Sequence, residues 1–467
     1  MPTERLSSLD ASFLSVETPT AHMHVGWAAL FDPPEAGPAP GFDALREHIG
    51  LRMTRAPLCR RKLRPVPFGV NSPVWVDDPD FDVADHVTEA RSPRLPEIVE
   101  GCFSEPLPRD RPLWQLRVAP RLEDGRIAVV GKAHHCMVDG IAAVELASLL
   151  LDPSPDADDP APDDWTPAPA PGGARLLFDG ALDLMRTELS LARLVPKAVG
   201  SLLRLRDTAE GAGRTAGALA DALRPAQPVA SLNEPISPAR RLGMFGRPIE
   251  DLLQIRRAFG VTLNDVVLAA SAGGVRRLLR RHGEDPISLK TMVPVNVRED
   301  DERGDFGNRI SFMFLDLPCD EPDPVRRLRD VHLATSERKE AHEAEGAETV
   351  IRSLDFAPSP VRRLVGRLLT SPRAFNLVVS NIPGPRPPMY MRGCRLVEAY
   401  PVVPIADRHA LSVGFTSVRD RACFGLYADR RSLRDVDELA REVDASIDEL
   451  LERSANPAPA PALVAAG

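Results

Sequence analysis

The sequence predicts a mixed α/β protein built from two halves. Strand-like apolar runs and helical apolar stripes occur in both parts of the chain, and hydrophobic residues make up 43% of the 467 residues, enough for sizeable cores. A stretch rich in proline and aspartate over residues 152–173 keeps no apolar periodicity and should be an extended linker. We expect a first half over residues 1–152, a linker and helical connector over 153–230, a second half over 231–453 and a disordered tail over 454–467.

The elements of the first half follow from its apolar patterns. Strands are expected at residues 74–76 and 127–130, and helices at residues 42–55 and 95–103. A further helix is expected from Gly140 to Leu151, because Ala142, Leu146, Leu149 and Leu150 form a helical stripe.

The second half shows the same mixture. The expected helices cover residues 249–259, 263–281 and 436–452, the second of them started by Thr262 or Asn264. The expected strands cover residues 289–295, 309–317, 377–380 and 421–427.

The most informative motif is the pattern HHxxxDG, which follows the strand expected at residues 127–130. It consists of His134, His135, Asp139 and Gly140. A histidine can take a proton from a hydroxyl near neutral pH, and adjacent residues leaving a strand point to opposite sides. One of the two should therefore face a cavity and the other the packing behind it, and we expect His135 to be the catalytic base and His134 to be structural or to help orient the site.

Asp139 and Gly140 would hold the loop that carries His135. The aspartate can cap the following helix or pair with a buried arginine, and Gly140 permits a backbone torsion that other residues resist. Arg298 closes an apolar strand in the other half, so we predict an ion pair of Asp139 with Arg298 or a neighbouring arginine. A polar cluster without catalytic function and a metal site are the competing interpretations. We expect no metal, because no second pair of ligands with metal-binding spacing accompanies the motif.

Six motifs in the right order resemble the bacterial wax ester synthase/diacylglycerol acyltransferase family, from about residue 6 to about residue 452. They are the segments 6–13 with 23–26, 73–82, Pro112-Leu113-Trp114, HHxxxDG, Asn264-Asp265, and 293–298 with 307–309 and 376–385. The chain departs from many relatives at one position, where Cys136 replaces alanine after the second histidine. Cys136 is expected to pack beside the strand, although a nucleophilic Cys-His pair is the alternative.

This resemblance implies a chloramphenicol acetyltransferase-like fold, in which two αβ halves enclose a substrate tunnel with the HHxxxDG loop at its middle. It also implies fatty acyl-CoA as the co-substrate, a long-chain alcohol or diacylglycerol as the acceptor, and no cofactor. Two alternatives stay open: an acyltransferase of the same fold that uses another alcohol, such as a glycolipid or polyketide hydroxyl, and a non-catalytic lipid-binding or lipid-droplet protein.

The other family motifs are expected to support the structure. Asn264 and Asp265 stand at a helix start, where capping is their ordinary role. Pro112, Leu113 and Trp114 are expected to pack in the core rather than contact substrate.

Composition narrows the class of protein and its surroundings. The formal charge of −9 argues against general nucleic-acid binding, and the spacing of the six cysteines suits free thiols in a reducing compartment. No secretory signal and no apolar run long enough to span a membrane is present, so a cytoplasmic location is expected. The sequence leaves the oligomeric state open.

The connector over residues 175–224 is expected to be helical and is rich in leucine and arginine. We favour helices that pack on the body of the protein. The alternative is an anchor at the inner membrane face or on a lipid droplet, with apolar residues in the lipid and arginine near phosphate.

Overall fold

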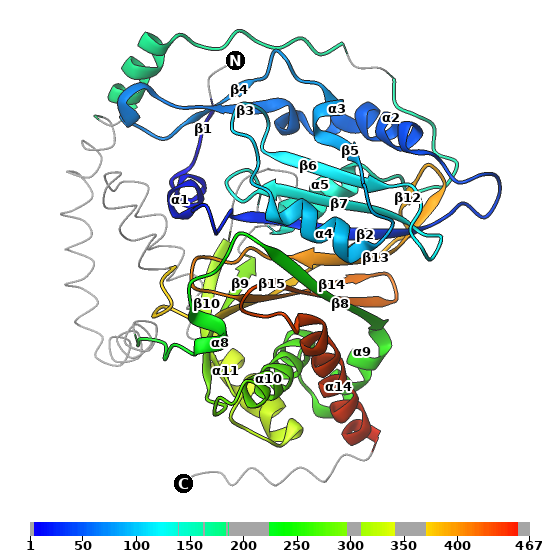
Figure 1. Ribbon diagram of the computed structural model, residues 1–467, viewed down its shortest axis with the longest axis vertical. Helices are drawn as coiled ribbons and strands as arrows, with labels where there is room; N and C mark the ends of the chain where they lie inside the picture. The colour runs from blue at the N-terminus through cyan, green and yellow to red at the C-terminus, as the bar shows by residue number, and fades with distance from the viewer. Residues whose placement is uncertain are drawn as a thin grey trace.

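The computed structural model describes residues 4–138, 140–161, 164–183, 185, 224–296, 310–340 and 370–455. Two six-stranded sheets are stacked in the molecule, and Figure 1 shows the first sheet above the second. Each sheet has its own helices, and the sheets share an apolar core.

The first sheet carries the HHxxxDG motif and has the strand order β12-β13-β2-β7-β6-β5. Its central strands β2 and β7 are antiparallel, with His24 opposite His134. The strands are β2 (His24–Asp32), β5 (Val87–Glu89), β6 (Trp114–Ala119), β7 (Ile127–His134), β12 (Tyr390–Met391) and β13 (Cys394–Val402). The last two come from the second half of the chain, so this sheet is built from both halves.

Both faces of the first sheet are covered, because residues of β2 and β7 alternate between two apolar cores. Ala28 and Leu30 pack into the core shared with the second sheet, whereas Val25, Ala29 and Phe31 pack on the opposite face. The helices of this half are α1 (Ser8–Val16), α2 (Phe42–Arg52), α3 (Val83–His86), α4 (Leu95–Ser104) and α5 (Gly140–Leu149), with short 3₁₀ turns at Met53–Arg55, Pro57–Arg60 and Pro67–Gly69.

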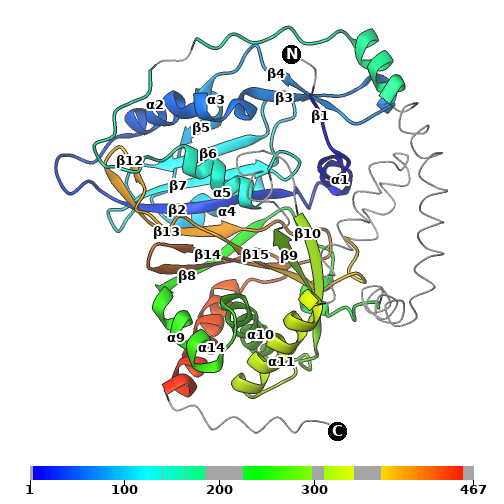
Figure 2. The ribbon, with the colours of Figure 1, turned by 180° about the vertical axis from the view of Figure 1, so that it is seen from behind.

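The second sheet has the order β10-β9-β11-β14-β15-β8, in which β11 pairs in parallel with β9 and β14. Its strands are β8 (Arg240–Pro248), β9 (Leu289–Asn296), β10 (Ile310–Leu317), β11 (Leu377–Ile382), β14 (Leu411–Val418) and β15 (Arg421–Asp429). The helices are α8 (Ala230–Asn233), α9 (Ile249–Phe259), α10 (Leu263–Arg281), α11 (Pro324–Glu340) and α14 (Val436–Ala455). Figure 2 shows α9, α10, α11 and α14 on the side of this sheet that faces away from the first half.

A small third sheet lies at the edge of the first half, with the order β1-β4-β3, where β1 is Glu4–Arg5, β3 is Arg61–Arg64 and β4 is Val74–Asp77. The helix over residues 173–183 packs on it, with Leu176 buried against Val74 and Val76.

Most of the predicted elements are confirmed within a few residues, and the mixed α/β class is confirmed. The helix expected over residues 42–55 ends earlier, because a 3₁₀ turn replaces its last turn at Met53–Arg55. The strand expected over residues 127–130 runs on to His134. In the described part of the linker, residues 157–161 and 164–172 form no helix or strand, as expected. Of the connector, residues 173–183 and 185 are helical, residue 224 is not, and residues 184 and 186–223 lie outside the described ranges.

Candidate active site

The HHxxxDG loop is tied by its backbone to two neighbouring segments. The amide of His134 donates to the Leu113 carbonyl, and the amide of His135 donates to the Met23 carbonyl, both at 2.9 Å. The amide of Met137 then donates to the His134 carbonyl, which closes a tight turn at the end of β7. Leu113 and Met23 belong to two of the family motifs, so these motifs position the histidines.

His135 is buried, and its ring stacks on Phe13. The ring centroids are 3.9 Å apart and the planes differ by 12°. Phe13 lies on α1, which begins after Ser7, whose hydroxyl oxygen accepts a hydrogen bond from the Asp10 amide. The stack limits the orientations of the imidazole, as a positioned base requires.

His134 is held differently and is neutral at physiological pH. Its Nδ1 accepts a hydrogen bond from the Cys136 amide at 3.1 Å, so the proton of the neutral ring belongs on Nε2. Burial, followed by the nearby charge of Arg109, lowers the pKa of His134 to about 3. Nε2 lies 3.7 Å from the Glu17 carboxylate, which also pairs with Arg109.

Cys136 packs inside the protein. It is 2% exposed, and burial raises the pKa of its thiol far above the ordinary value. Because the nucleophile is the thiolate, this environment disfavours a Cys-His pair at this position.

The predicted supporting residues occupy different places. Trp114 is buried, and its indole Nε1 donates to the Cys59 carbonyl at 2.7 Å. Asp265 is fully buried at the start of α10, where Thr262 is the N-cap and Asn264 is half-buried. The Asp265 carboxylate accepts hydrogen bonds from the Thr262 amide and the Thr335 hydroxyl, and lies 2.8 Å from His332 Nδ1. It therefore joins α10 to α11.

Two predicted residues, Asp139 and Arg298, lie outside the described residues, and their ion pair stays a prediction. Gly140 is the first residue of α5. Pro112 immediately precedes Leu113, and its carbonyl accepts a hydrogen bond from the Trp114 amide at 3.0 Å.

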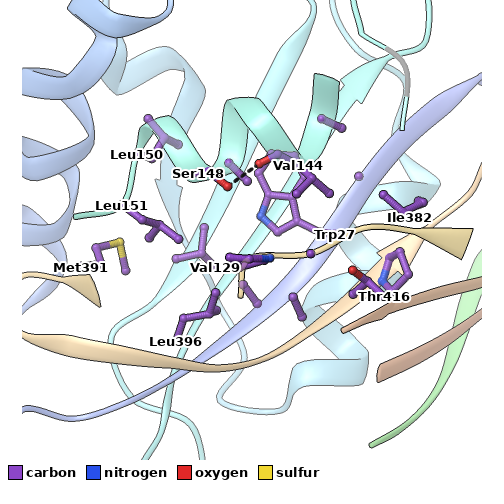
Figure 3. Close-up of a pocket in the computed structure, with 18 of the residues that line it drawn as sticks. Trp27, Val129, Val144, Ser148, Leu150, Leu151, Ile382, Met391, Leu396 and Thr416 are labelled. Atoms are coloured by element: carbon purple, nitrogen blue, oxygen red, sulfur yellow. Dashed lines mark hydrogen bonds between the residues drawn. The ribbon is translucent and has the colours of Figure 1, made fainter. Parts of the chain in front are cut away.

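An apolar cavity lies along α5, the helix that follows the motif. Helix α5 contributes Val144, and residues of β2, β13 and the segment after β11 complete the wall. Figure 3 shows Trp27, Val129, Val144, Leu150, Leu151, Ile382 and Leu396 around this space. Two of the residues labelled in Figure 3, Ser148 and Thr416, carry hydroxyl groups. The Ser148 hydroxyl donates to the Val144 carbonyl of its own helix at 2.8 Å. The cavity thus suits a hydrocarbon chain.

Sequence reasoning did not identify several residues of the site, namely Phe13, Glu17, Arg109 and the cavity residue Trp27. Phe13 was inside a family segment, but nothing in the pattern indicated its stack on His135. Glu17 and Arg109 are remote in sequence from the motif, and only the fold brings them to His134.

The described residues form neither a metal site nor a helix that could span a membrane by itself. In those ranges no three histidine, cysteine, aspartate or glutamate side chains are grouped so that they could hold a metal ion. None of the helices there has by itself the length and hydropathy of a membrane span, while α9 and α10 together meet the criteria only as a pair bent by 103°.

Comparison with known proteins agrees with the fold and the motifs. Residues 6–267 match the wax ester synthase/diacylglycerol acyltransferase catalytic domain, and residues 306–451 match the C-terminal domain of the same family. A probable diacylglycerol O-acyltransferase of Mycobacterium tuberculosis H37Rv is 35% identical, over 96% of this chain and 95% of that protein.

Solved structures give the same result. The wax ester synthase/diacylglycerol acyltransferase from Marinobacter aquaeolei VT8 is similar with a TM-score of 0.68 and 25% identity, covering 97% of this chain and all of that one. The first condensation domain of the calcium-dependent antibiotic synthetase shares the fold at a TM-score of 0.60 and 19% identity, covering 98% and 97% of the two chains. The expected two-half, chloramphenicol acetyltransferase-like architecture is thereby confirmed. The chain belongs to the wax ester synthase/diacylglycerol acyltransferase family.

Proposed function

We propose that the protein transfers a long-chain fatty acyl group from acyl-CoA to a lipid hydroxyl. Diacylglycerol as acceptor gives triacylglycerol, and a fatty alcohol gives a wax ester. The observation that carries this proposal is the position of His135, oriented by Phe13 at the end of β7, beside the helix that lines an apolar cavity. The motif continues into α5, whose residues Val144 and Ser148 line the cavity, and this arrangement fits a lipid alcohol.

In the proposed reaction, His135 takes the proton of the acceptor hydroxyl as the oxygen attacks the thioester carbonyl. The tetrahedral intermediate collapses, the carbon–sulfur bond breaks, and the thiolate takes the proton back from His135. The products are an ester and free CoA thiol. The reaction needs no cofactor and no metal, which stays a prediction for this chain.

The remaining motif residues would prepare the site. His134 would support the site as a neutral ring. Its Nδ1 accepts the hydrogen bond from the Cys136 amide, and its Nε2 lies near the Glu17 carboxylate that pairs with Arg109. Backbone amides near Gly140 are our candidates for the donors that stabilise the oxyanion. Asp139, through its predicted partner Arg298, would brace the loop.

Thiol release from palmitoyl-CoA tests the proposal, with hexadecanol and dioleoylglycerol offered in parallel. We expect release that depends on one of these acceptors, with formation of the matching ester, and loss of that release in His135→Ala. The control variant is His282→Ala, which removes a histidine at the far end of α10. Thiol release with a glycolipid or polyketide alcohol, and with neither hexadecanol nor dioleoylglycerol, would support an acyltransferase of the same fold that uses another alcohol. Failure with a wide acceptor panel would support the lipid-binding protein.

We also propose a peripheral contact with a lipid surface through the edge of the first half. Phe68 is 93% exposed and has a positive φ of 60°, a strained backbone for a residue with a side chain. The helix over residues 173–183 lies beside the 3₁₀ turn Pro67–Gly69 that carries Phe68. A Cβ placed on Gly173 would lie 3.6 Å from Pro67 Cγ. Phe178 of that helix and nearby Met185 are exposed as well, at 68% and 58%.

Flotation with anionic vesicles tests this contact. We expect Phe68→Ser combined with Phe178→Ser to reduce the floated fraction, because each change removes an apolar group from the lipid side. The matched control is Leu333→Ser, which removes an exposed hydrophobic side chain from α11. Equal flotation of the double variant, the control and the unchanged protein would exclude this contact.

A further inference from the structure

We propose that Trp27 sets the length of the alkyl chain that the enzyme accepts, because its indole separates two apolar cavities. This inference rests on the function proposed above and adds a residue that determines specificity. It starts from the cavity along α5 and from a smaller second cavity, to which α5 contributes Leu146.

The second cavity lies deeper, toward β6 and the 3₁₀ turns that follow α2. Its wall includes Met53, Cys59, Trp114, Leu116, Ala133 and Leu146. Among the described residues, Trp27 and Leu150 line both this cavity and the first one. The two spaces are therefore neighbours, with these two side chains between them.

The indole of Trp27 lies across the sheet rather than along its own strand. Trp27 is on β2, but a Cβ placed on Gly131 of β7 would lie 2.5 Å from its Cζ2 atom and 2.7 Å from its Cε2 atom. The same Cβ would lie 2.9 Å from Leu116 Cδ2 on β6. The ring thus lies over Gly131, and Figure 3 shows it among the residues that line the first cavity.

An alkyl chain is the occupant that the apolar walls of these spaces favour. The described residues that line the second cavity expose apolar surface to it, and the amine of Lys132, a residue of its wall, donates to the Cys102 and Glu105 carbonyls. Ala133 in its wall is two residues before His135, and Val144 in the first cavity is four residues after Gly140. Both cavities are consequently linked to the catalytic motif through β7 and α5.

A chain that enters the first cavity would end against Trp27. With a small side chain at this position the volume now filled by the indole would open at the end of the first cavity, and a longer chain could bury its last carbons there, against the residues that line the second cavity. Hydrophobic pockets discriminate substrates that differ by one methylene by about tenfold or more, so the change should be large enough to measure.

The experiment compares Trp27→Ala, Trp27→Leu and Trp27→Phe with the unchanged protein. One series varies the acyl-CoA from lauroyl to arachidoyl at a fixed acceptor, and the other varies the alcohol at a fixed acyl-CoA. We expect the ratio of kcat/KM for the longest chain to that for the shortest chain to rise about tenfold in Trp27→Ala, and less in Trp27→Leu. Trp27→Phe should stay close to the unchanged protein. The series that shifts identifies whether the acyl group or the alcohol occupies the cavity.

Met53→Ala provides a second arm, because it enlarges only the deeper cavity. On its own it should leave the chain-length ratio unchanged, and combined with Trp27→Ala or Trp27→Leu it should raise the ratio further. Active Trp27 variants with the unchanged ratio in both series would overturn the proposal, even if acyl transfer itself is established. Absence of acyl transfer in the unchanged protein would instead refute the function on which the proposal rests. If Trp27→Ala does not fold, Trp27→Leu decides.

Discussion

At the scale of single residues, two adjacent histidines have different surroundings. His135 stacks on Phe13 of α1, whereas His134 accepts a hydrogen bond from the Cys136 amide and lies near Glu17. The low pKa of His134, about 3, keeps it uncharged throughout the pH range in which His135 would act as a base. A neutral His134 adds no positive charge next to the base, so it does not oppose proton uptake by His135.

Replacing Phe13 by leucine tests whether the stack of Phe13 on His135 orients the imidazole ring. Leucine fills much of the same space but has no flat face, so the His135 ring gains freedom and we expect kcat to fall about tenfold. The free energy of unfolding should change by less than about 1.5 kcal/mol, as for other swaps of similar volume. Steady-state kinetics and urea unfolding measure the two effects.

Phe245→Leu is the matched control for this prediction. Phe245 stacks on Phe424 at 4.5 Å within the second half, so its loss removes a comparable contact away from the histidines. A kcat of Phe13→Leu equal to that of Phe245→Leu would show that the stack does not orient the base.

At the scale of elements, local patterns were sufficient where one segment carries its own signal. Helix α10 was predicted at its observed bounds, with Thr262 or Asn264 as its start, and the structure shows Thr262 as the N-cap in a capping box with Asp265. Strand β9 was predicted within one residue, since the apolar residues Met292, Val293 and Val295 stand between polar segments.

Elements that depend on remote partners could not be predicted. Strand β13 alternates between buried and half-buried residues and contains a register shift between Leu396 and Glu398. Strand β8 contains two glycines and three arginines, which weaken its strand signal. Their places in the two sheets are set by pairing with β2 and β15, and a single sequence does not show that pairing.

Some residues of the candidate site could likewise be predicted from local sequence, and others could not. The spacing of HHxxxDG was enough to select His134 and His135, because that chemistry is local to one loop. Phe13, Trp27 and the cavity along α5 were not found, because they depend on how α1, β2 and α5 pack around the loop.

At the scale of the whole molecule, β13 connects the two halves. Its Glu398 is buried, and the carboxylate accepts hydrogen bonds from Arg421 at 2.7 Å, from the Tyr400 hydroxyl at 2.8 Å and from Arg126 at 3.0 Å. Arg126 precedes β7 of the first sheet, while Arg421 begins β15 of the second. One carboxylate therefore links both sheets through side-chain hydrogen bonds.

Glu398→Gln tests this link. We expect the free energy of unfolding to fall by about 2 kcal/mol at pH 7, because the variant loses hydrogen bonds between charged groups. Burial raises the pKa of Glu398, but the hydrogen bonds from Arg421 and Tyr400 outweigh it, so the folded pKa lies below the ordinary 4.5. The stabilisation is present above that ordinary value and is lost as the pH falls through the folded pKa.

The difference between the variant and the unchanged protein should therefore shrink in urea unfolding below pH 4.5. Glu97→Gln is the control, since Glu97 pairs with Arg94 on the surface and such pairs contribute about 0–1 kcal/mol. A loss in Glu398→Gln no larger than in this control would mean that the buried carboxylate does not stabilise the joined halves.

The central claim is that His135 is the base of an acyl transfer to a lipid hydroxyl. The most direct measurement is acceptor-dependent thiol release from palmitoyl-CoA by His135→Ala, compared with the unchanged protein and with His282→Ala. We expect release to fall about 10³-fold in His135→Ala alone, within the range for loss of a general acid–base group, while unfolding stays cooperative. Release by folded His135→Ala at the rate of the unchanged protein would contradict this claim.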